Sequence, residues 1–187
     1  ENLPFKLTNA QERTIKEISE DISLAKPMRR LVQGDVGSGK TVVAAMSMYI
    51  SAKNNSQSVL LCPTEVLAEQ HFKNFSGWFK NLNIKIEFLT GKMPVSKRRG
   101  IYQDLENGEI DILIGTHAVF QEKVKMKNLG LVVVDEQQRF GVKQRFDLVK
   151  KSSDQIMPHQ LFMTATPIPR TLATVSYTHL RAHETAF

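Results

Sequence analysis

The sequence predicts an α/β domain in which a mostly parallel sheet is covered by helices on both faces. Two observations support this fold class. Short apolar runs of strand length alternate along the chain with stretches of helical length. A glycine-rich P-loop pattern joins one of these strands to one of these helices. Because such alternation builds right-handed βαβ units, we expect the strands to run parallel to one another.

The predicted elements follow in a regular order. The first helix, residues 8–25, has capping-box spacing at Thr8 and Gln11 and stops before Pro27. The lysines of residues 123–127 alternate with apolar residues, which suits a short edge strand protected against pairing. Six further strands are expected at residues 30–33, 58–62, 85–89, 111–115, 130–135 and 160–164. The other helices are expected at residues 40–53, 65–80, 95–107 and 138–150.

The P-loop pattern G-x-x-x-x-G-K-[ST] predicts a nucleoside triphosphate site. It is formed by Gly34, Asp35, Val36, Gly37, Ser38, Gly39, Lys40 and Thr41. Glycines let backbone N–H groups approach a polyphosphate without a Cβ clash, and the positive end of the following helix attracts the anion. We expect Lys40 to reach the β- and γ-phosphates and the Thr41 hydroxyl to ligate Mg²⁺. The alternative is a glycine-rich turn with only a structural role.

A second part of this site is expected after the apolar run at residues 131–134. The run is typical of a buried parallel strand and ends in Asp135 and Glu136. Ligands of open α/β sheets bind at the carboxyl ends of the strands. Asp135 is then placed to hold Mg²⁺, and Glu136 to polarise the water that attacks the γ-phosphate. Two adjacent carboxylates also suit a solvated turn, but the P-loop upstream favours the catalytic interpretation.

Composition is consistent with one ordinary globular domain. The 187 residues can bury a sizeable core, and 41% hydrophobic with 24% charged residues is unexceptional. No apolar run approaches about 18 residues and no signal-peptide pattern opens the chain, so we expect a cytoplasmic protein. The single cysteine, Cys62, cannot form an internal disulfide. The net charge of +6 favours a polyanionic partner over a nucleotide alone.

Seven motifs follow one another in a fixed order and spacing. They occupy residues 3–11, 34–41, 63–71, 89–91, 115–118, 135–142 and 163–172. Over residues 3–173 the chain therefore resembles the first motor lobe of superfamily-two DNA helicases, and within them the bacterial RecG-type helicases. The resemblance implies a RecA-like P-loop NTPase lobe. It also implies ATP-dependent helicase or translocase activity on branched DNA and stalled replication forks, in recombination and repair.

Two other enzyme classes are alternatives. The transcription-repair coupling factor shares residues 139–142 and 164–172, but it usually has an aromatic at Ser38 and a second glutamate at Gln137. Both departures favour the RecG type. That type most often has histidine where this chain has Gln138, the position that couples hydrolysis to DNA. A P-loop small-molecule kinase would leave the remaining motifs, including the threonines that follow the strands, without a role.

The resemblance also implies roles near the nucleotide base. Gln11 is similar to the helicase glutamine that recognises the adenine edge through its paired donor and acceptor. Phe5 is expected to lie beside the base. The alternative for Gln11 is a purely structural role in the capping box of the first helix.

The same resemblance implies a DNA track. Thr64, Thr90 with Gly91, and Thr116 follow strands or begin helices, where hydroxyl and backbone N–H groups suit phosphate oxygens. By spacing alone, each threonine is more often a helix N-cap. The run Thr164, Ala165 and Thr166 is similar to the motif that couples the ATP site to DNA.

The family pattern ends near Thr174. Residues 175–187 resemble an adapter-derived reading frame of the kind found at the ends of environmental sequence fragments. We therefore expect an ATP-binding lobe at residues 1–174 and a non-native tail at residues 175–187. The resemblance further implies a second motor lobe and an N-terminal wedge domain outside this chain.

Overall fold

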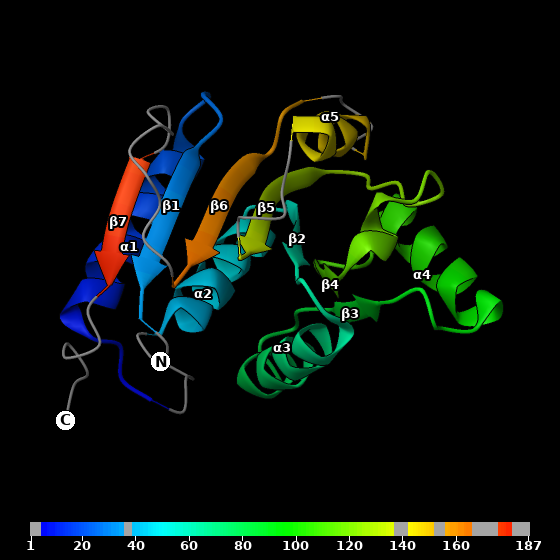
Figure 1. Ribbon diagram of the computed structural model, residues 1–187, viewed down its shortest axis with the longest axis horizontal. Coiled ribbons are helices and arrows are strands. Elements are labelled where there is room, and N and C mark those ends of the chain that lie inside the picture. The colour runs from blue at the N-terminus through cyan, green and yellow to red at the C-terminus, as the bar shows by residue number, and fades with distance from the viewer. Residues whose placement is uncertain (1–4, 36–38, 137–141, 152–155, 166–175, 181–187) are drawn as a thin grey trace.

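Seven parallel strands form one sheet within the part of the chain that the structure describes (Figure 1). The structure is a computed structural model that describes residues 5–35, 39–136, 142–151, 156–165 and 176–180. The strand order across the sheet is β3-β4-β2-β5-β6-β1-β7. The strands are β1 Arg29–Gly34, β2 Gln57–Leu61, β3 Ile86–Leu89, β4 Ile112–Gly115, β5 Leu129–Asp135, β6 His159–Thr164 and β7 Ser176–Leu180.

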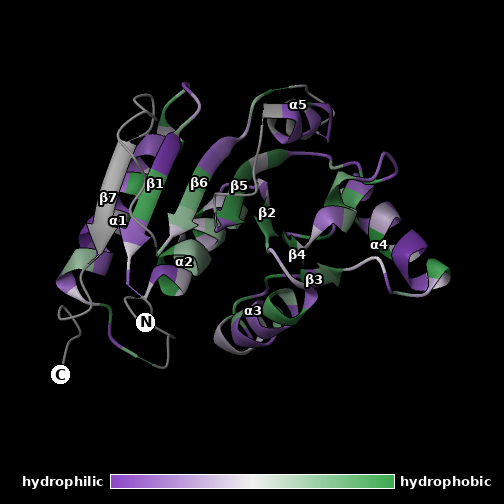
Figure 2. Ribbon diagram, in the orientation of Figure 1, coloured by the Kyte–Doolittle hydropathy of each residue, from purple (hydrophilic) through white to green (hydrophobic). Residues whose placement is uncertain are grey.

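Helices cover both faces of this sheet. They are α1 Asn9–Ser23, α2 Lys40–Lys53, α3 Glu65–Trp78, α4 Val95–Asn107, α5 Val142–Lys151 and the 3₁₀ helix η1 His117–Phe120. Successive residues of a strand point to opposite faces. On β2, Leu60 packs in the core with α1, α2 and α3, whereas Val59 and Leu61 pack in the core with α4 and η1. Strands buried on both faces carry long apolar runs, and Figure 2 shows hydrophobic residues along β5 and the second half of β2.

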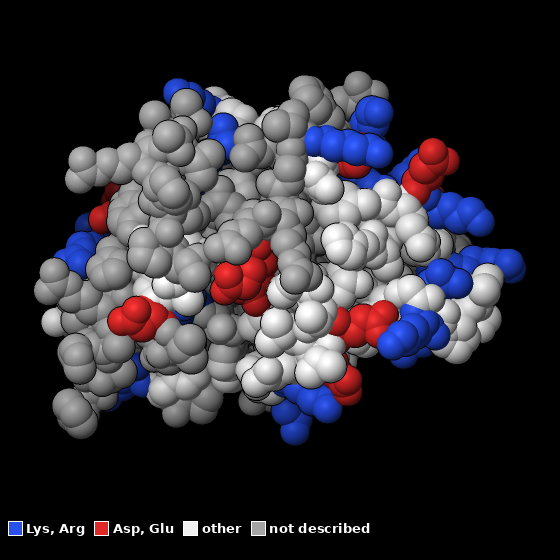
Figure 3. All heavy atoms as spheres, viewed as in Figure 1, with Lys and Arg blue, Asp and Glu red and all other residues white. Residues whose placement is uncertain are grey.

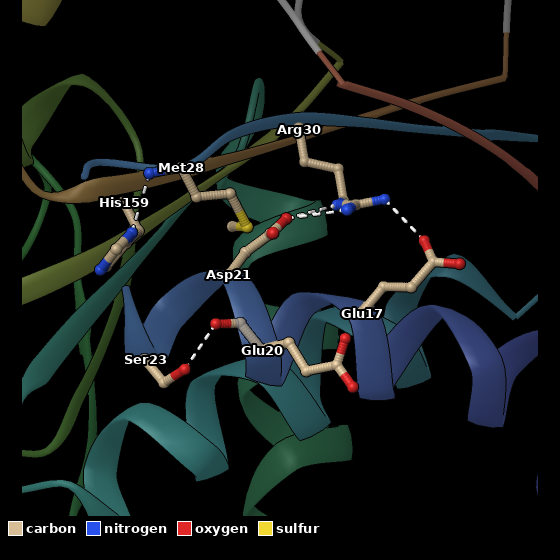
Figure 4. Close-up of polar contacts among 7 residues, drawn as sticks. All are labelled: Glu17, Glu20, Asp21, Ser23, Met28, Arg30 and His159. Atoms are coloured by element: carbon tan, nitrogen blue, oxygen red, sulfur yellow. Dashed lines mark hydrogen bonds and ion pairs between the residues drawn. The ribbon is translucent and has the colours of Figure 1, made fainter. Parts of the chain in front are cut away.

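Helix α1 is fixed to the sheet by a buried arginine of β1 (Figure 4). The Arg30 guanidinium lies 2.8 Å from Glu17 Oε2 and 2.8 Å from Asp21 Oδ2, both on α1. A buried charge must be paired, so these two carboxylates hold the helix against β1. At the same end of the sheet, the Met28 N–H donates to His159 Nδ1 over 2.9 Å, which joins the starts of β1 and β6.

The predicted α/β architecture is confirmed, with element ends within a few residues of those expected. The edge strand predicted at residues 123–127 is wrong. Val124 and Met126 are buried in the core under α4, and the Met126 N–H donates to the Lys151 carbonyl of α5 over 2.8 Å. The segment therefore fills the space between two helices and one face of the sheet. The strands at the two edges of the sheet are β3 and β7.

Two predictions concern the C-terminal part of the chain. The start of the helix predicted at residues 138–150 lies outside the described residues, and α5 begins at Val142. Strand β7, a seventh strand that the sequence did not predict, pairs in parallel with β1 from Arg30–Ser176 to Gly34–Leu180. That residues 175–187 form a non-native tail stays a prediction. No helix of the described residues is long and apolar enough to cross a membrane.

Candidate functional site

Six of the sequence motifs lie at one edge of the sheet. Because the strands are parallel, their carboxyl ends meet at this edge, where α/β proteins bind ligands. The P-loop, the Thr164 motif and Asp135 follow β1, β6 and β5, which are neighbours in the sheet. Thr64, Thr116 and Thr90 follow β2, β4 and β3, which are neighbours in the other half. The edge is thus divided into two groups of motifs.

Lys40 begins α2 and lies close to the end of β1. Its ammonium group donates to the carbonyls of Gly34 and Asp35, the latter over 3.0 Å. An ammonium group has three donors, so one N–H remains for a further acceptor. Burial lowers the pKa of Lys40, and the charges of Glu136 and Asp135 act in the opposite direction. The lysine therefore lies within the electrostatic reach of the acidic pair, as a shared nucleotide site requires.

Gly39 and Gln11 join the P-loop to the start of α1. Gly39 is the N-cap of α2 in the left-handed region, with φ of 80°, which favours glycine. A Cβ atom there would lie 1.9 Å from Gln11 Nε2, so the glutamine occupies that space. Gln11 Nε2 lies 3.4 Å from the Gly39 carbonyl and donates to it.

The structure also shows what Gln11 and Phe5 do within the fold. Gln11 Oε1 accepts from the Thr8 N–H over 2.9 Å, and the Thr8 hydroxyl accepts from the Gln11 N–H over 3.2 Å. The capping box predicted from spacing is thus confirmed. Phe5 is partly exposed and meets Trp78 of α3 edge-on, with ring centroids 5.5 Å apart. Contact of either residue with adenine stays a prediction.

Asp135 and Glu136 end β5 beside buried groups of β2 and α3. Asp135 Oδ2 lies 3.1 Å from His71 Nε2. Burial, and then the charge of Asp135, raise the pKa of the Cys62 thiol at the end of β2. Glu136 has φ of 58°, and its N–H donates to the Met163 carbonyl over 2.9 Å. The left-handed φ of Glu136 thus turns the chain directly after Asp135.

The acidic pair lines a pocket between the two halves of the edge. Its walls come from the ends of β2, β4 and β5, with Gln144 of α5. Thr116 and His117 line the same pocket as Asp135 and Glu136. A predicted DNA contact and the predicted metal ligand therefore face one cavity.

Among the threonines of the other half, Thr64 has a clear local role. Thr64 is the N-cap of α3, and its hydroxyl accepts from the Leu67 N–H over 3.3 Å. Thr90 is buried, and Gly91 after it is exposed. Thr116 is the N-cap of η1 without a side-chain capping bond. The N-cap alternative is thus confirmed for Thr64, while DNA contact stays a prediction for all four residues.

The remaining site predictions lie at the end of β6 or outside the described residues. Thr164 is fully buried and pairs with Gln33 of β1, and Ala165 follows it. Val36, Gly37, Ser38, Gln138 and Thr166 lie outside the described residues. The sequence did not single out His71, although it ends the 63–71 motif, because only the fold brings it to Asp135.

The oxygen donors of this site fit the predicted metal. A carboxylate from Asp135 and a hydroxyl from Thr41 are the hard ligands that Mg²⁺ prefers. Thr41 lies in the first turn of α2, directly after the lysine that approaches the acidic pair. The chemistry of the donors thus agrees with the prediction made from the P-loop.

A family model described as DEAD/DEAH box helicase matches residues 8–175. The chain belongs to the DEAD/DEAH box helicases. The family implies use of a nucleotide, which agrees with the P-loop. This result also confirms the superfamily predicted from the motifs.

Within this family, the chain is similar to proteins named RecG. The chain is 51% identical over 177 residues to the ATP-dependent DNA helicase RecG of Aquifex aeolicus (strain VF5), which covers 95% of this chain and 22% of that protein. It is 50% identical over 179 residues to the protein of the same name from Escherichia coli (strain K12), with 95% and 26% covered. A solved structure of RecG bound to a three-way DNA junction matches with a TM-score of 0.82 at 42% identity. It covers 95% of this chain and 24% of that chain.

These matches confirm the resemblance to RecG that the motifs predicted. The chain spans about a quarter of the length of the curated relatives it matches.

Proposed function

We propose that this chain is the ATP-binding lobe of a RecG-type DNA helicase that acts on branched DNA and stalled replication forks. The observation that carries the proposal is the divided edge of the sheet. The P-loop, the Asp135 and Glu136 pair and the predicted coupling motif follow β1, β5 and β6, and threonine motifs suited to a DNA backbone follow β2, β4 and β3. The names of the relatives and the junction-bound structure support the same function.

In the nucleotide half, each residue has a distinct task. Lys40 neutralises charge on the β- and γ-phosphates with the N–H that it does not give to the P-loop carbonyls. Thr41 and Asp135 would hold Mg²⁺, which would supply further positive charge beside the phosphates. Glu136 orients the attacking water and accepts its proton. From the sequence motif, we expect Val36, Gly37 and Ser38 to contribute to phosphate binding as well.

Adenine is recognised next to the start of α1. Gln11 uses one amide N–H and one oxygen lone pair within the fold, and its second N–H and second lone pair suit the adenine edge. Phe5 is partly exposed and held edge-on by Trp78, so its free surface suits a base.

In the DNA half, Thr64, Thr90, Gly91 and Thr116 contact backbone phosphates. Such contacts carry no base specificity, as a translocating enzyme requires. Figure 3 shows lysines and arginines gathered over α4 beside this half, which adds attraction for a polyanion. Hydrolysis is coupled to DNA by Gln138, Thr164, Ala165 and Thr166. Thr116 and Asp135 line the same pocket, so the proposed DNA contact and the proposed metal ligand are close enough for such coupling.

The test measures ATP turnover by the full-length helicase that carries this lobe, with and without three-way junction DNA. We expect turnover to rise at least tenfold with DNA and DNA affinity to fall steeply with salt. The slope of log K against log[salt] should be about −0.7 to −0.9 per phosphate contacted. Glu136→Gln should keep ATP and DNA binding but abolish turnover. A small-molecule kinase would show turnover independent of DNA. A transcription-repair coupling factor would respond to duplex as strongly as to the junction.

A further inference from the structure

His71 of α3 makes a contact with the predicted metal ligand that the P-loop chemistry does not account for. Its Nε2 atom lies 3.1 Å from Asp135 Oδ2. An ionised carboxylate only accepts hydrogen bonds, so the proton lies on His71 Nε2 and is donated to Asp135. The contact joins residues that are 64 positions apart in sequence and lie on different elements.

The surroundings of the imidazole show that this contact sets its orientation. His71 is 8% exposed, and its other ring nitrogen, Nδ1, is buried without a partner among the described residues. The bond from Nε2 to Asp135 is therefore the polar contact that orients the ring within the described part of the chain. The ring packs against the fully buried Phe75, one helical turn later, with centroids 6.1 Å apart. A rigid helix and a packed neighbour thus fix the donor.

We propose that His71 is a positioning residue that holds the Asp135 carboxylate in the orientation that binds Mg²⁺. The inference rests on the proposed function of Asp135 as a ligand. Residues that hydrogen-bond to metal ligands restrict ligand rotation, and their loss commonly weakens metal binding about 10- to 100-fold. With His71 in place, the second carboxylate oxygen of Asp135 is left for the metal.

The experiment uses the 187-residue chain and measures Mn²⁺ binding by electron paramagnetic resonance, with a slowly hydrolysed ATP analogue at saturation. His71→Phe keeps an aromatic ring but removes the donor, and we expect Mn²⁺ affinity to fall about tenfold. His71→Gln retains an N–H at a comparable reach and should restore affinity to within about threefold of wild type. Lys73→Ala, an exposed change on the same helix, is the matched control and should leave affinity unchanged.

A second readout separates positioning from a structural role. Affinity for the ATP analogue in excess chelator should be the same in all four proteins, because the polar contact of His71 goes to Asp135, whereas Lys40 bonds to Gly34 and Asp35. Equal Mn²⁺ affinity in wild type and His71→Phe would overturn the inference. So would an equal loss of metal-free nucleotide affinity, because that would mark His71 as structural. If the wild-type chain itself shows no metal-dependent nucleotide binding, the proposed function fails instead.

Discussion

At the residue scale, the charge of Lys40 makes the most direct prediction. Its ammonium group lies at the end of β1 within reach of the acidic pair, with one N–H free of the P-loop carbonyls. A charge-assisted hydrogen bond contributes about 1.5–3 kcal/mol, so Lys40→Ala should weaken ATP affinity at least tenfold. Titration with a fluorescent ATP analogue measures this. Lys53→Ala removes the same charge from the exposed end of α2 and should bind as wild type does. Equal affinity in both variants would show that Lys40 only braces the P-loop.

Residues also differ in how far sequence could predict their contacts. The capping box of Thr8 and Gln11 lies within one helical turn, and its spacing alone predicted both hydrogen bonds. The same is true of Thr64 at the start of α3. By contrast, the contact of His71 with Asp135 depends on how β2 and β5 pair, which no local pattern encodes. Predictions limited to one turn were therefore the ones that held in atomic detail.

At the element scale, β3 and β4 pack closely at Gly115. A Cβ atom there would lie 2.7 Å from the Leu89 carbonyl oxygen and 2.7 Å from a Val119 methyl group. The carbonyl belongs to the backbone and cannot move aside cheaply, so Gly115→Ala should destabilise the fold by about 1–3 kcal/mol. Gly77→Ala in α3, where a Cβ meets nothing within 4 Å, should stabilise it by up to about 1 kcal/mol. Urea denaturation of both variants checks the opposite signs. If Gly115→Ala stabilised the fold, the Leu89 carbonyl of β3 would have to move away from the new methyl group at little cost.

The starts of β1 and β6 predict how stability depends on pH. His159 Nδ1 accepts from the Met28 N–H, so protonation of the ring breaks this bond. Burial lowers the pKa of His159, although the Asp21 charge and a bond to the Ile22 backbone act in the opposite direction. The unfolded chain then takes up the proton more readily than the folded chain. Stability is therefore full above about pH 6.5, the unfolded value, and falls as the pH drops below it.

A variant without the titrating ring isolates this effect. His159→Gln retains an acceptor for the Met28 N–H but has no proton to gain in this range. We expect the free energy of unfolding of wild type to fall more steeply than that of His159→Gln between pH 7 and pH 5. Urea denaturation at a series of pH values measures both slopes. Parallel slopes would assign the acid sensitivity to other groups.

Element prediction failed where the pattern fitted two environments equally well. The alternation at residues 123–127 correctly indicated that Val124 and Met126 point one way and the lysines the other. It did not reveal that the buried side chains meet helices as well as the sheet face, or that the backbone pairs with helix ends. Periodicity reports which side of a segment is buried, and only tertiary packing decides what covers it.

At the scale of the whole molecule, the sheet order places the two proposed binding regions side by side along one edge. Several strands pair with partners that are distant in sequence, and β5 lies between β2 and β6. Asp135 therefore follows the strand where the nucleotide half meets the DNA half, and it faces the same pocket as Thr116. The α/β class and six of the strands were predictable from alternation, but this order was not. No local sequence pattern reports which strands from distant segments pair in the sheet.

We predict that this chain alone binds ATP but scarcely hydrolyses it, with or without DNA. On the proposed assignment, the lobe binds the nucleotide and orients water through Lys40, Thr41, Asp135 and Glu136. By resemblance, a second motor lobe supplies arginines that stabilise charge on the γ-phosphoryl group, a contribution of about 10³- to 10⁵-fold in rate. The chain spans only about a quarter of its full-length relatives.

Solvent adds to this limitation, because the acidic pair is only partly buried in the lobe itself. In water the attraction between fixed charges and a developing phosphoryl charge is several-fold weaker than in a closed cleft. The test is to titrate the chain with ATP and then measure phosphate release with and without junction DNA, using the full-length helicase as the positive control. Binding without release is the expected result. Turnover by the chain at a rate near that of the full-length enzyme would contradict the prediction. It would show that Lys40 and Glu136 need no arginine from a second lobe.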